Sequence, residues 1–261
     1  MERDFDFDFR AQGVGIVYGK PWKEAVIKLL EPRSPYRPWQ THGSLAPGQT
    51  VVVVLDTDPQ SVLPAVGVIG ADGDIDRALT KIDTFRLRGL FELATLNMVT
   101  DLGLGQGGYL SASAEQVTGV LDRYIRSSAA TMVGHTTLAA GRILLASGGS
   151  CTGCSRRIDL MGENARDRLH VHPVDAGPSD NPDWPAALCD DCRDRMTEGG
   201  FTNFLDFRYS LNPSCPECSA QRTAAAMYGM PAGPVEQPWL TPMGCCVGPE
   251  EWRCRACGHQ W

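Results

Sequence analysis

Four Cys-x-x-Cys pairs in the second half of this 261-residue chain constrain its fold more than any other feature. Two thiolates separated by two residues can point at one ion, and two such pairs complete a tetrahedral four-cysteine zinc site. Taken in order, the pairs close loops of 34 residues (155–188) and 35 residues (219–253), each too small for a large core of its own. We therefore predict two structural Zn²⁺ ions, whose binding supplies folding free energy. The ligands are Cys151, Cys154, Cys189, Cys192, Cys215, Cys218, Cys254 and Cys257.

Disulfides, or a thioredoxin-like redox pair, are the alternative use of these cysteines. The start of the chain, residues 1–10, alternates Asp with Phe and lacks the basic head and apolar core of a secretory signal. The longest dense apolar stretch, residues 50–55, is far shorter than the roughly 18 residues that a membrane span needs. We therefore expect a cytoplasmic protein without membrane contact, in which zinc is favoured over disulfides.

The charge of the chain argues against broad binding of nucleic-acid phosphates. There are 24 Lys and Arg against 31 Asp and Glu, a net charge of −7, and −5 of it falls on residues 151–261. Phosphate binding normally uses a basic surplus, so any nucleic-acid role must rest on a local patch. Each Cys-x-x-Cys pair is called a knuckle below. The two remaining cysteines, Cys245 and Cys246, are adjacent and cannot form a knuckle of this type. They stay unassigned.

Apolar patterning in the first half predicts a mixed fold. β-branched and apolar runs indicate strands at 13–18, 50–56 and 65–69, which would form a small sheet. Helical periodicity predicts helices over 23–30, most of 74–99, 114–125 and 136–145. Ser113 and Gln116 have the spacing of a capping box at the start of the third of these helices.

Gly103, Gly105 and Gly108 match the G-x-G-x-x-G fingerprint of dinucleotide-binding folds. That motif needs a strand before it and an acidic residue about 20 positions later. Here a helical pattern precedes the glycines, and residues 127–134 contain no acid. We interpret the segment as a loop between helices.

The N-terminal segment loosely resembles the small β-barrels of the PUA and EVE type. The resemblance rests on Pro47-Gly48-Gln49 before a strand and on Gly67-Val68-Ile69-Gly70. Because those domains hold modified bases, it implies a base-stacking pocket, for which the aromatic candidates are Trp22, Tyr36 and Trp39.

The segment from Cys151 to Cys192 resembles the HNH endonuclease family, a ββα-metal fold. It has a knuckle, then residues 158–160, then the strand-like run 169–174, then Leu188 and a second knuckle. In that family a residue at the end of the strand binds a catalytic divalent metal, and the following histidine is the general base. The resemblance therefore implies action on DNA with Mg²⁺ or Mn²⁺.

Aligning Leu169 and Val171 with the apolar positions of that strand places His172 on the metal position and Pro173 on the position of the base. Proline cannot accept a proton, so the site departs from the family pattern. His170 and His172 would share one face of the strand, because side chains alternate along it. With Asp175 nearby, these three residues are the candidate catalytic set.

Residues 215–261 resemble a bacterial zinc ribbon. The first knuckle reads Cys-Pro-Glu-Cys, and Gly258 directly follows the second, where a left-handed backbone suits glycine. Zinc ribbons serve nucleic-acid proteins and also bind protein partners, so this module alone does not select a function.

Together these features predict an α+β protein with four segments: a β-rich N-terminal domain (1–90), a helical connector (91–147), an HNH-like zinc module (148–200) and a zinc ribbon (201–261). The leading hypothesis is an HNH-type endonuclease, or a degenerate relative, acting on DNA. The alternative is a non-catalytic zinc module that binds a protein partner, through its ribbon, or a nucleic acid, modified or unmodified. A third hypothesis is that the N-terminal domain reads modified DNA and the zinc region only supports it.

Overall fold

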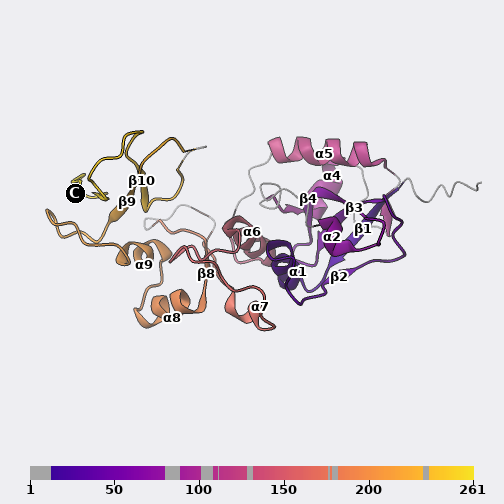
Figure 1. The fold of residues 1–261 in the computed structure, drawn as a ribbon, viewed down its shortest axis with the longest axis horizontal. Coiled ribbons are helices and arrows are strands. Elements are labelled where there is room, and N and C mark those ends of the chain that lie inside the picture. Colours follow the sequence, from indigo (N-terminus) through magenta and orange to yellow (C-terminus); the bar gives the residue numbers. More distant parts are fainter. Residues whose placement is uncertain are drawn as a thin grey trace, which may run out of the picture. The chain divides into compact units, whose positions relative to one another are not determined.

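A computed structural model describes residues 13–79, 89–100, 108–110, 112–127, 132–175, 177, 182–231 and 235–261 of the chain. The chain divides into two compact units, Met1–Pro178 with Pro185–Asp190 and Ser179–Trp184 with Asp191–Trp261. Helices and sheets both occur, so the predicted α+β class is confirmed (Figure 1). The division into four segments stays a prediction. No helix in the described ranges combines the length and apolar character that crossing a bilayer requires.

A six-stranded sheet forms the centre of the first unit. Its main path runs β2 (Trp39–Gln40), β1 (Val14–Gly19), β3 (Thr50–Leu55), β4 (Ser61–Val68) and β5 (Phe91–Glu92), and β6 (Tyr109–Leu110) also pairs with β1. Strands β1 and β3 are parallel, with α1 (Trp22–Leu30) in their connection, and the other pairs are antiparallel. The predicted strands at 13–18 and 50–56 are confirmed, and the run at 65–69 is the end of the longer β4.

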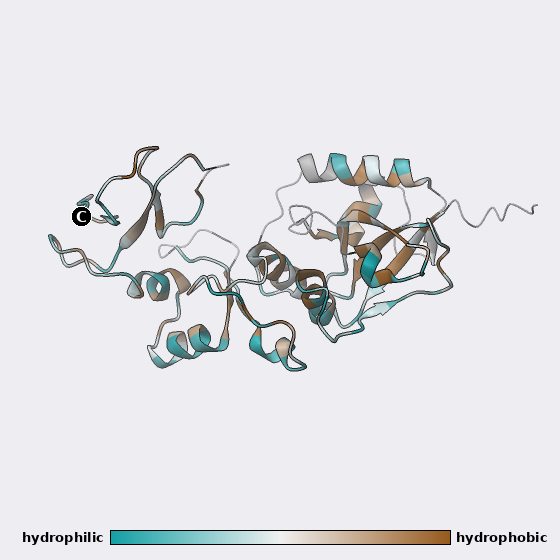
Figure 2. Ribbon diagram, in the orientation of Figure 1, coloured by the Kyte–Doolittle hydropathy of each residue, from teal (hydrophilic) through white to brown (hydrophobic). Residues whose placement is uncertain are grey.

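One face of this sheet packs against α4 (Leu93–Thr100) and α5 (Ala114–Ser127). Alternate residues of the central strands point into this core, together with Leu96 of α4 and with Val117 and Leu121 of α5, which are one helical turn apart. Teal and brown alternate along α5 in Figure 2, as expected of a helix with one buried face. The fully buried strand residues of this core are Val14, Ile16, Val52, Val54 and Val62.

The opposite face of the sheet is covered as well, which explains the unbroken apolar run of β3. Val51, Val53 and Leu55 are as fully buried as their neighbours on the other face. Gly19 allows α1 to approach, because a Cβ there would lie 2.7 Å from Cβ of Ala25 and 2.5 Å from a Leu55 methyl. The central strands are accordingly brown in Figure 2.

The predicted capping box at Ser113 forms as the sequence indicates. Ser113 N donates to Gln116 Oε1 at 2.9 Å and Gln116 N donates to Ser113 Oγ at 3.3 Å, a reciprocal capping box. Helix α6 (Thr137–Ser147) begins after Thr136, whose side chain accepts a bond from Ala139 N. The predicted helices 23–30, 114–125 and 136–145 are therefore confirmed.

The prediction of helix over most of 74–99 is wrong in part. Residues Ile75–Leu79 (α2) and Leu93–Thr100 (α4) are helical, but Phe91–Glu92 form β5 and pair with Val62 and Ser61 of β4. Phe91 is 3 % exposed and sits in the sheet core, so burial against strands overrides the helical spacing. Residues 80–88 lie outside the described ranges.

The glycine-rich segment is described only from Gly108 onwards, so the loop predicted around Gly103 and Gly105 lies outside the described residues. Gly108 accepts a hydrogen bond from Ile16 N at 3.1 Å and is followed by strand β6. Strand β6 therefore lies between Gly108 and α5, in a segment that was predicted to be a loop between helices.

A second, two-stranded sheet completes the first unit. Strand β7 (His170–His172) follows the short helix α7 (Ala165–Arg168) and pairs antiparallel with β8 (Ala186–Leu188). All three residues of β8 are buried. This hairpin places the two histidines of β7 opposite Leu188 and Ala186.

The second unit contains α8 (Asp190–Glu198), which begins at the unit boundary, α9 (Phe204–Ser210) and a three-stranded sheet ordered β10 (Leu240–Pro242), β9 (Thr223–Met227), β11 (Trp252–Cys254). Strand β9 is parallel to β10 and antiparallel to β11. The apolar centre of the second unit is aromatic. Trp239 makes edge contacts with Trp184 and Phe204, at ring-centroid distances of 5.6 and 5.7 Å.

Candidate metal centres

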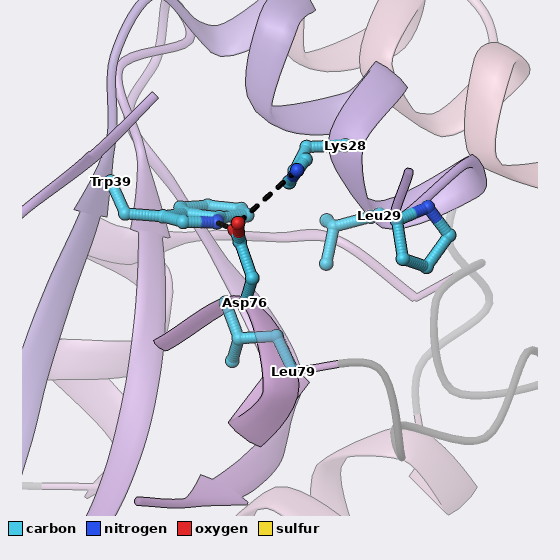
Figure 3. A pocket seen from close by; sticks show the side chains of 6 residues that line it. Lys28, Leu29, Trp39, Asp76 and Leu79 are labelled. Atoms are coloured by element: carbon cyan, nitrogen blue, oxygen red, sulfur yellow. Dashed lines mark hydrogen bonds and ion pairs between the residues drawn. The ribbon is translucent and has the colours of Figure 1, made fainter. Parts of the chain in front are cut away.

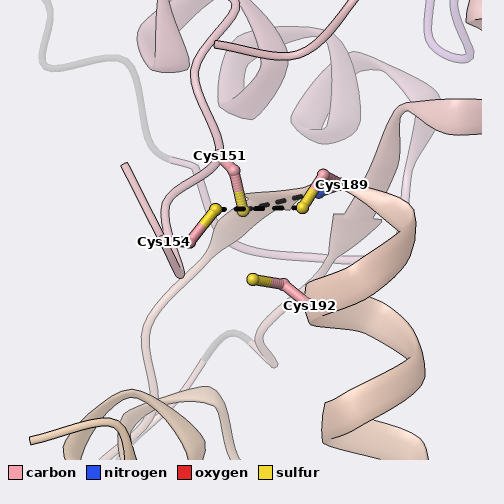
Figure 4. Close-up of side chains that lie close together, drawn as sticks. All are labelled: Cys151, Cys154, Cys189 and Cys192. Carbon is pink, nitrogen blue, oxygen red and sulfur yellow. Dashed lines mark hydrogen bonds between the residues drawn. The ribbon is translucent and has the colours of Figure 1, made fainter. Parts of the chain in front are cut away.

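The first two cysteine pairs meet at one point. The sulfur atoms of Cys151, Cys154, Cys189 and Cys192 all lie within 4.8 Å of one another (Figure 4). Cys154 Sγ and Cys189 Sγ are 3.9 Å apart. A tetrahedral zinc ion with Zn–S bonds of about 2.3 Å holds its sulfurs about 3.8 Å apart, whereas a disulfide needs about 2.05 Å. The spacing therefore fits a four-thiolate metal site and excludes disulfides in this structure.

The second two pairs meet in the same way. The sulfurs of Cys215, Cys218, Cys254 and Cys257 lie within 4.8 Å of one another. Two sulfur pairs, Cys215 with Cys257 and Cys218 with Cys254, are each separated by 3.6 Å. The predicted sequential pairing of knuckles is therefore confirmed, and both groups have a donor set compatible with structural zinc.

Three of the four knuckles share one backbone design. In each, the first cysteine accepts a hydrogen bond at its carbonyl from the residue four positions on and donates its N–H to the residue five positions on. The donors to Cys151, Cys215 and Cys254 are the N–H groups of Ser155, Ser219 and Gly258, at 2.8, 2.9 and 3.0 Å. These three residues have positive φ angles of 60°, 60° and 80°. The left-handed backbone predicted at Gly258 thus also occurs at two serines.

The knuckle at Cys189 and Cys192 is built differently, at the end of β8 and in the first turn of α8. Cys189 N donates to Cys151 Sγ at 3.4 Å, so the backbone also stabilises a thiolate of the other pair. Cys192 lies near the N-terminus of the helix, where the helix dipole favours negative charge. This knuckle needs no left-handed residue, because the helix itself turns the chain.

The second group already favours the thiolate form at one position. Burial raises the pKa of the Cys254 thiol, but hydrogen bonds from the backbone N–H groups of Cys257 and Ala256 and from neighbouring thiols lower it to about 6. The Ala256 N–H lies 3.3 Å from Cys254 Sγ. A thiol held near its ionised form binds a metal cation with less cost in deprotonation.

The candidate catalytic residues have other partners. His170 Nε2 lies 2.7 Å from Asp190 Oδ1, and Arg168 Nε lies 3.5 Å from the other oxygen of the same carboxylate. The hydrogen bond with His170 lowers the pKa of Asp190 below its ordinary value, and Arg168 acts in the same direction. Asp175 is exposed and its Oδ1 lies 2.8 Å from His135 Nε2.

His172 lies on the same strand as His170, two residues further on. Within the described ranges, the metal-ligating groups found with three or more ligand atoms inside 4.8 Å are the two cysteine groups. His170, His172 and Asp175 are therefore not gathered into such a group, and their catalytic role stays a prediction. The partners of His170 and Asp175 are 20 and 40 residues away in the sequence, so the spacing of a short motif could not predict them.

A small pocket that the sequence did not predict is lined by Lys28, Leu29, Pro32, Trp39, Asp76 and Leu79 (Figure 3). Lys28 is 4 % exposed; its Nζ lies 3.1 Å from Asp76 Oδ2 and donates to Ser34 O at 2.9 Å. Trp39 Nε1 donates to Asp76 Oδ1 at 2.7 Å. Because both charges are paired, we interpret this cluster as a structural ion pair. A single lysine within the apolar run 26–30 was the sequence signal for it.

The aromatic residues predicted to form a base-stacking pocket do not all line this pocket. Trp39 does, but Trp22 and Tyr36 are not among the lining residues. Tyr36 Oη instead donates to Glu163 O at 2.8 Å and accepts from Arg166 N at 3.0 Å. The base-binding role of this region stays a prediction.

No protein-family model matches the chain, and neither the curated proteins nor the solved structures with which it was compared give a match. What the chain does must therefore be inferred from its own residues, and the two four-cysteine groups are the strongest of these observations.

Proposed function

We propose that residues 148–200 form an HNH-like zinc module and that the chain acts on DNA as an endonuclease. One observation carries this proposal: the β7–β8 hairpin is followed directly in sequence by α8, and the first four-cysteine group holds the turn at Cys151 and the start of α8. This is the order ββα with a structural zinc, in which the hairpin presents catalytic side chains.

The histidines of β7 are the groups that would do the chemistry. His170 is held by Asp190 at 2.7 Å, and a carboxylate that fixes one imidazole nitrogen leaves the other in a defined orientation. An imidazole oriented in this way can accept a proton from a water molecule that attacks a phosphodiester. His172, which shares its strand face by the period of two, is the candidate ligand for Mg²⁺ or Mn²⁺.

The second candidate function is a non-catalytic zinc module that binds a protein partner or a modified nucleic acid. Two observations favour it: Pro173 occupies the position expected for the general base, and the side chains of His170 and Asp175 are already paired with Asp190 and His135. The net charge of −7 also supports a partner other than DNA.

Cleavage of plasmid and of base-modified phage DNA separates the two functions. Zinc-loaded protein is incubated with DNA and Mg²⁺ or Mn²⁺, beside the variants His172→Ala, His170→Ala and Asp190→Asn, each checked for two zinc ions. We expect nicking by the wild type and loss of about 100-fold or more in each histidine variant, the lower range for removing a general base. Absence of nicking by the zinc-loaded wild type would reject the endonuclease and favour the binding module.

A control variant uses a histidine outside the candidate catalytic set. His42 is exposed, and its ring centroid lies 5.0 Å from that of Tyr18. If β7 carries the chemistry, His42→Ala leaves the cleavage rate unchanged. An equal loss in His42→Ala and His170→Ala would point to a general effect on folding instead of a catalytic role.

A further inference from the structure

Three arginines of the second unit, Arg208, Arg222 and Arg255, lie around one tyrosine and are called the arginine cluster below. Arg222 Cζ lies 5.3 Å from the centroid of the Tyr209 ring. Tyr209 Oη and Arg255 Nε both donate to Pro238 O, at 2.9 and 3.2 Å, so the Arg255 guanidinium lies beside the phenol. Arg208 directly precedes Tyr209 in α9. Neither the two cysteine groups nor the proposed endonuclease uses these side chains.

The charges of the arginine cluster act together on the Tyr209 hydroxyl. Burial raises the pKa of Tyr209, and the positive charges of Arg255, Arg222 and Arg208 lower it. Because a Coulomb interaction weakens with distance, all three guanidinium groups lie near this one oxygen. The electrostatics therefore agree with the contacts that the cluster is a single region of positive charge.

The strand register places two of these arginines directly opposite each other. Strand β11 pairs antiparallel with β9, and Cys254 is opposite Thr223. Arg255 N donates to Arg222 O at 2.8 Å, so the same register holds for the next pair of residues. Opposite side chains of an antiparallel pair lie on one face with their Cβ atoms about 4.5–5.5 Å apart, and like charges there are destabilising. The sheet therefore holds two positive charges where folding alone would favour opposite ones.

One carboxylate offsets part of this charge. Arg222 Nη2 lies 2.6 Å from Asp206 Oδ1. The side chain of Arg255 donates to uncharged carbonyl groups instead, from Nε to Pro238 O at 3.2 Å and from Nη2 to Leu240 O at 2.6 Å. Within the described part of the chain, the ion pair with Asp206 is the one that involves Arg222 or Arg255. The two opposed guanidinium groups thus share one carboxylate.

Both opposed arginines can be reached by a ligand from solvent. The side chain of Arg222 is 43 % exposed, and Arg255 is exposed. The two bonds of Arg255 to carbonyl groups use two of its five N–H donors, so the other donors can bind a ligand. The same two bonds hold the guanidinium in place before a ligand arrives, which lowers the entropy cost of binding.

We propose that Arg222 and Arg255 bind the phosphodiester backbone of DNA, and that Arg208 adds to the positive charge around them. The planar fork of arginine matches phosphate oxygens in a bidentate way. Each DNA strand carries one phosphate per about 3.4 Å of rise, so two neighbouring guanidinium groups can contact the same phosphate or adjacent ones. The choice of DNA as the polyanion rests on the proposed function. The cluster supplies the local basic patch that DNA binding requires in a chain with a net charge of −7.

The test measures how tightly the full-length, zinc-loaded chain binds a short fluorescein-labelled DNA duplex, by fluorescence anisotropy without added Mg²⁺ or Mn²⁺. Arg222→Gln and Arg255→Gln are each expected to weaken binding about tenfold, as for the loss of a hydrogen bond to a charged group. Each should also reduce the slope of log K against log salt concentration by about 1.

Arg123→Gln is the matched control, since Arg123 is exposed in α5 and its loss changes the net charge by the same amount. It should bind DNA like the wild type. Unchanged binding in both cluster variants, or an equal loss in Arg123→Gln, would overturn the proposal. Each variant is first checked for two zinc ions.

A variant that strengthens binding keeps the proposal testable even if the glutamine variants fail to fold. Asp206→Asn removes the carboxylate that competes with DNA for Arg222, so DNA binding should tighten, by up to about fivefold for a partly exposed ion pair. Glu115→Gln is its control, because Glu115 is exposed in α5 and carries the same charge. Unchanged or weaker binding in zinc-loaded Asp206→Asn, or equal tightening in Glu115→Gln, would reject the site.

A labelled polyglutamate peptide is the second probe. Cluster variants that lose the peptide and keep DNA would overturn the proposal and assign the cluster to an acidic protein partner. Because binding is measured without a divalent metal, it does not depend on cleavage. A chain that binds DNA through the cluster but does not nick it rejects only the endonuclease, and a chain that nicks DNA but binds it equally well in both glutamine variants rejects only the cluster.

Discussion

The two four-cysteine groups have the same chemistry in different surroundings. In the group at Cys151, two cysteines are buried and the other two are half-buried, whereas in the group at Cys215 two are buried and two are exposed. The first group lies next to β8, whose residues are all buried. The second closes a three-stranded sheet in which the last three residues of β9 are only half-buried.

This difference indicates that zinc contributes unequally to the folding free energy around the two cysteine groups. Around the ribbon little apolar surface is buried, so metal binding has to supply much of the folding free energy. The six-stranded sheet of the first unit has a core of its own, with many side chains fully buried, and does not include a cysteine ligand in that core. We therefore expect the ribbon to depend on its metal and the N-terminal sheet to be independent of both ions.

The largest effect is expected when one cysteine ligand is removed from the group at Cys215. Cys254→Ser removes one of four ligands, and structural zinc is worth about 10–16 kcal/mol in small zinc-finger peptides. We expect amides of β9 and β11 to lose their protection from hydrogen exchange while those of β1 and β3 keep theirs. Cys245→Ser is the control, since Cys245 lies outside the group. Protected ribbon amides in Cys254→Ser would show that the ribbon folds without its metal.

A core truncation tests the independence of the N-terminal sheet. Leu121 of α5 is 1 % exposed within the sheet core, so Leu121→Ala should lower the free energy of unfolding by about 2–5 kcal/mol. Urea denaturation measures this loss. The zinc content should remain two per chain, and a fall in bound zinc would mean that the core and the metal sites are not separate.

The exposure of the sulfurs should set the order in which zinc leaves. Cys218 and Cys257 are exposed, so a chelator or an alkylating reagent reaches the second group first. We expect release from this group to be about tenfold faster, equivalent to about 1.4 kcal/mol in the barrier. Mass spectrometry of alkylated peptides gives the order, and earlier modification of Cys154 or Cys189 would reverse the comparison.

The smallest effect concerns the left-handed residues of the knuckles. Ser219 adopts a φ of 60° where its counterpart in the other knuckle of the group is Gly258. Ser219→Gly should stabilise the zinc-bound chain by about 0.5–1 kcal/mol, because glycine adopts this backbone without steric cost. Thermal unfolding measures the gain. Destabilisation would show that the Ser219 side chain matters more than its backbone.

The metal groups could be predicted from the sequence because a knuckle is a local feature. Each Cys-x-x-Cys pair fixes two ligands within four residues, and sequential pairing was sufficient to assign all eight cysteines. The capping box at Ser113 and the strands β1 and β3 are local in the same sense, since each follows from neighbouring residues.

What the sequence did not indicate depends on partners far along the chain. Phe91 joins a strand because β4 is beside it, although its spacing fits a helix. Asp76 pairs with Lys28 across 48 positions, and His170 meets Asp190 across the β7–β8 hairpin. Periodicity reports which face of an element is buried but not what lies against it.

Native mass spectrometry of the full-length chain tests the central claim, that both cysteine groups hold structural zinc, most directly. We expect two zinc ions per chain and a protein mass with every cysteine reduced, and stepwise chelation should remove one ion before the other. A chain that contains no zinc and has the lower mass of disulfide-bonded cysteines would contradict the claim. A chain that holds only one zinc ion would contradict it as well.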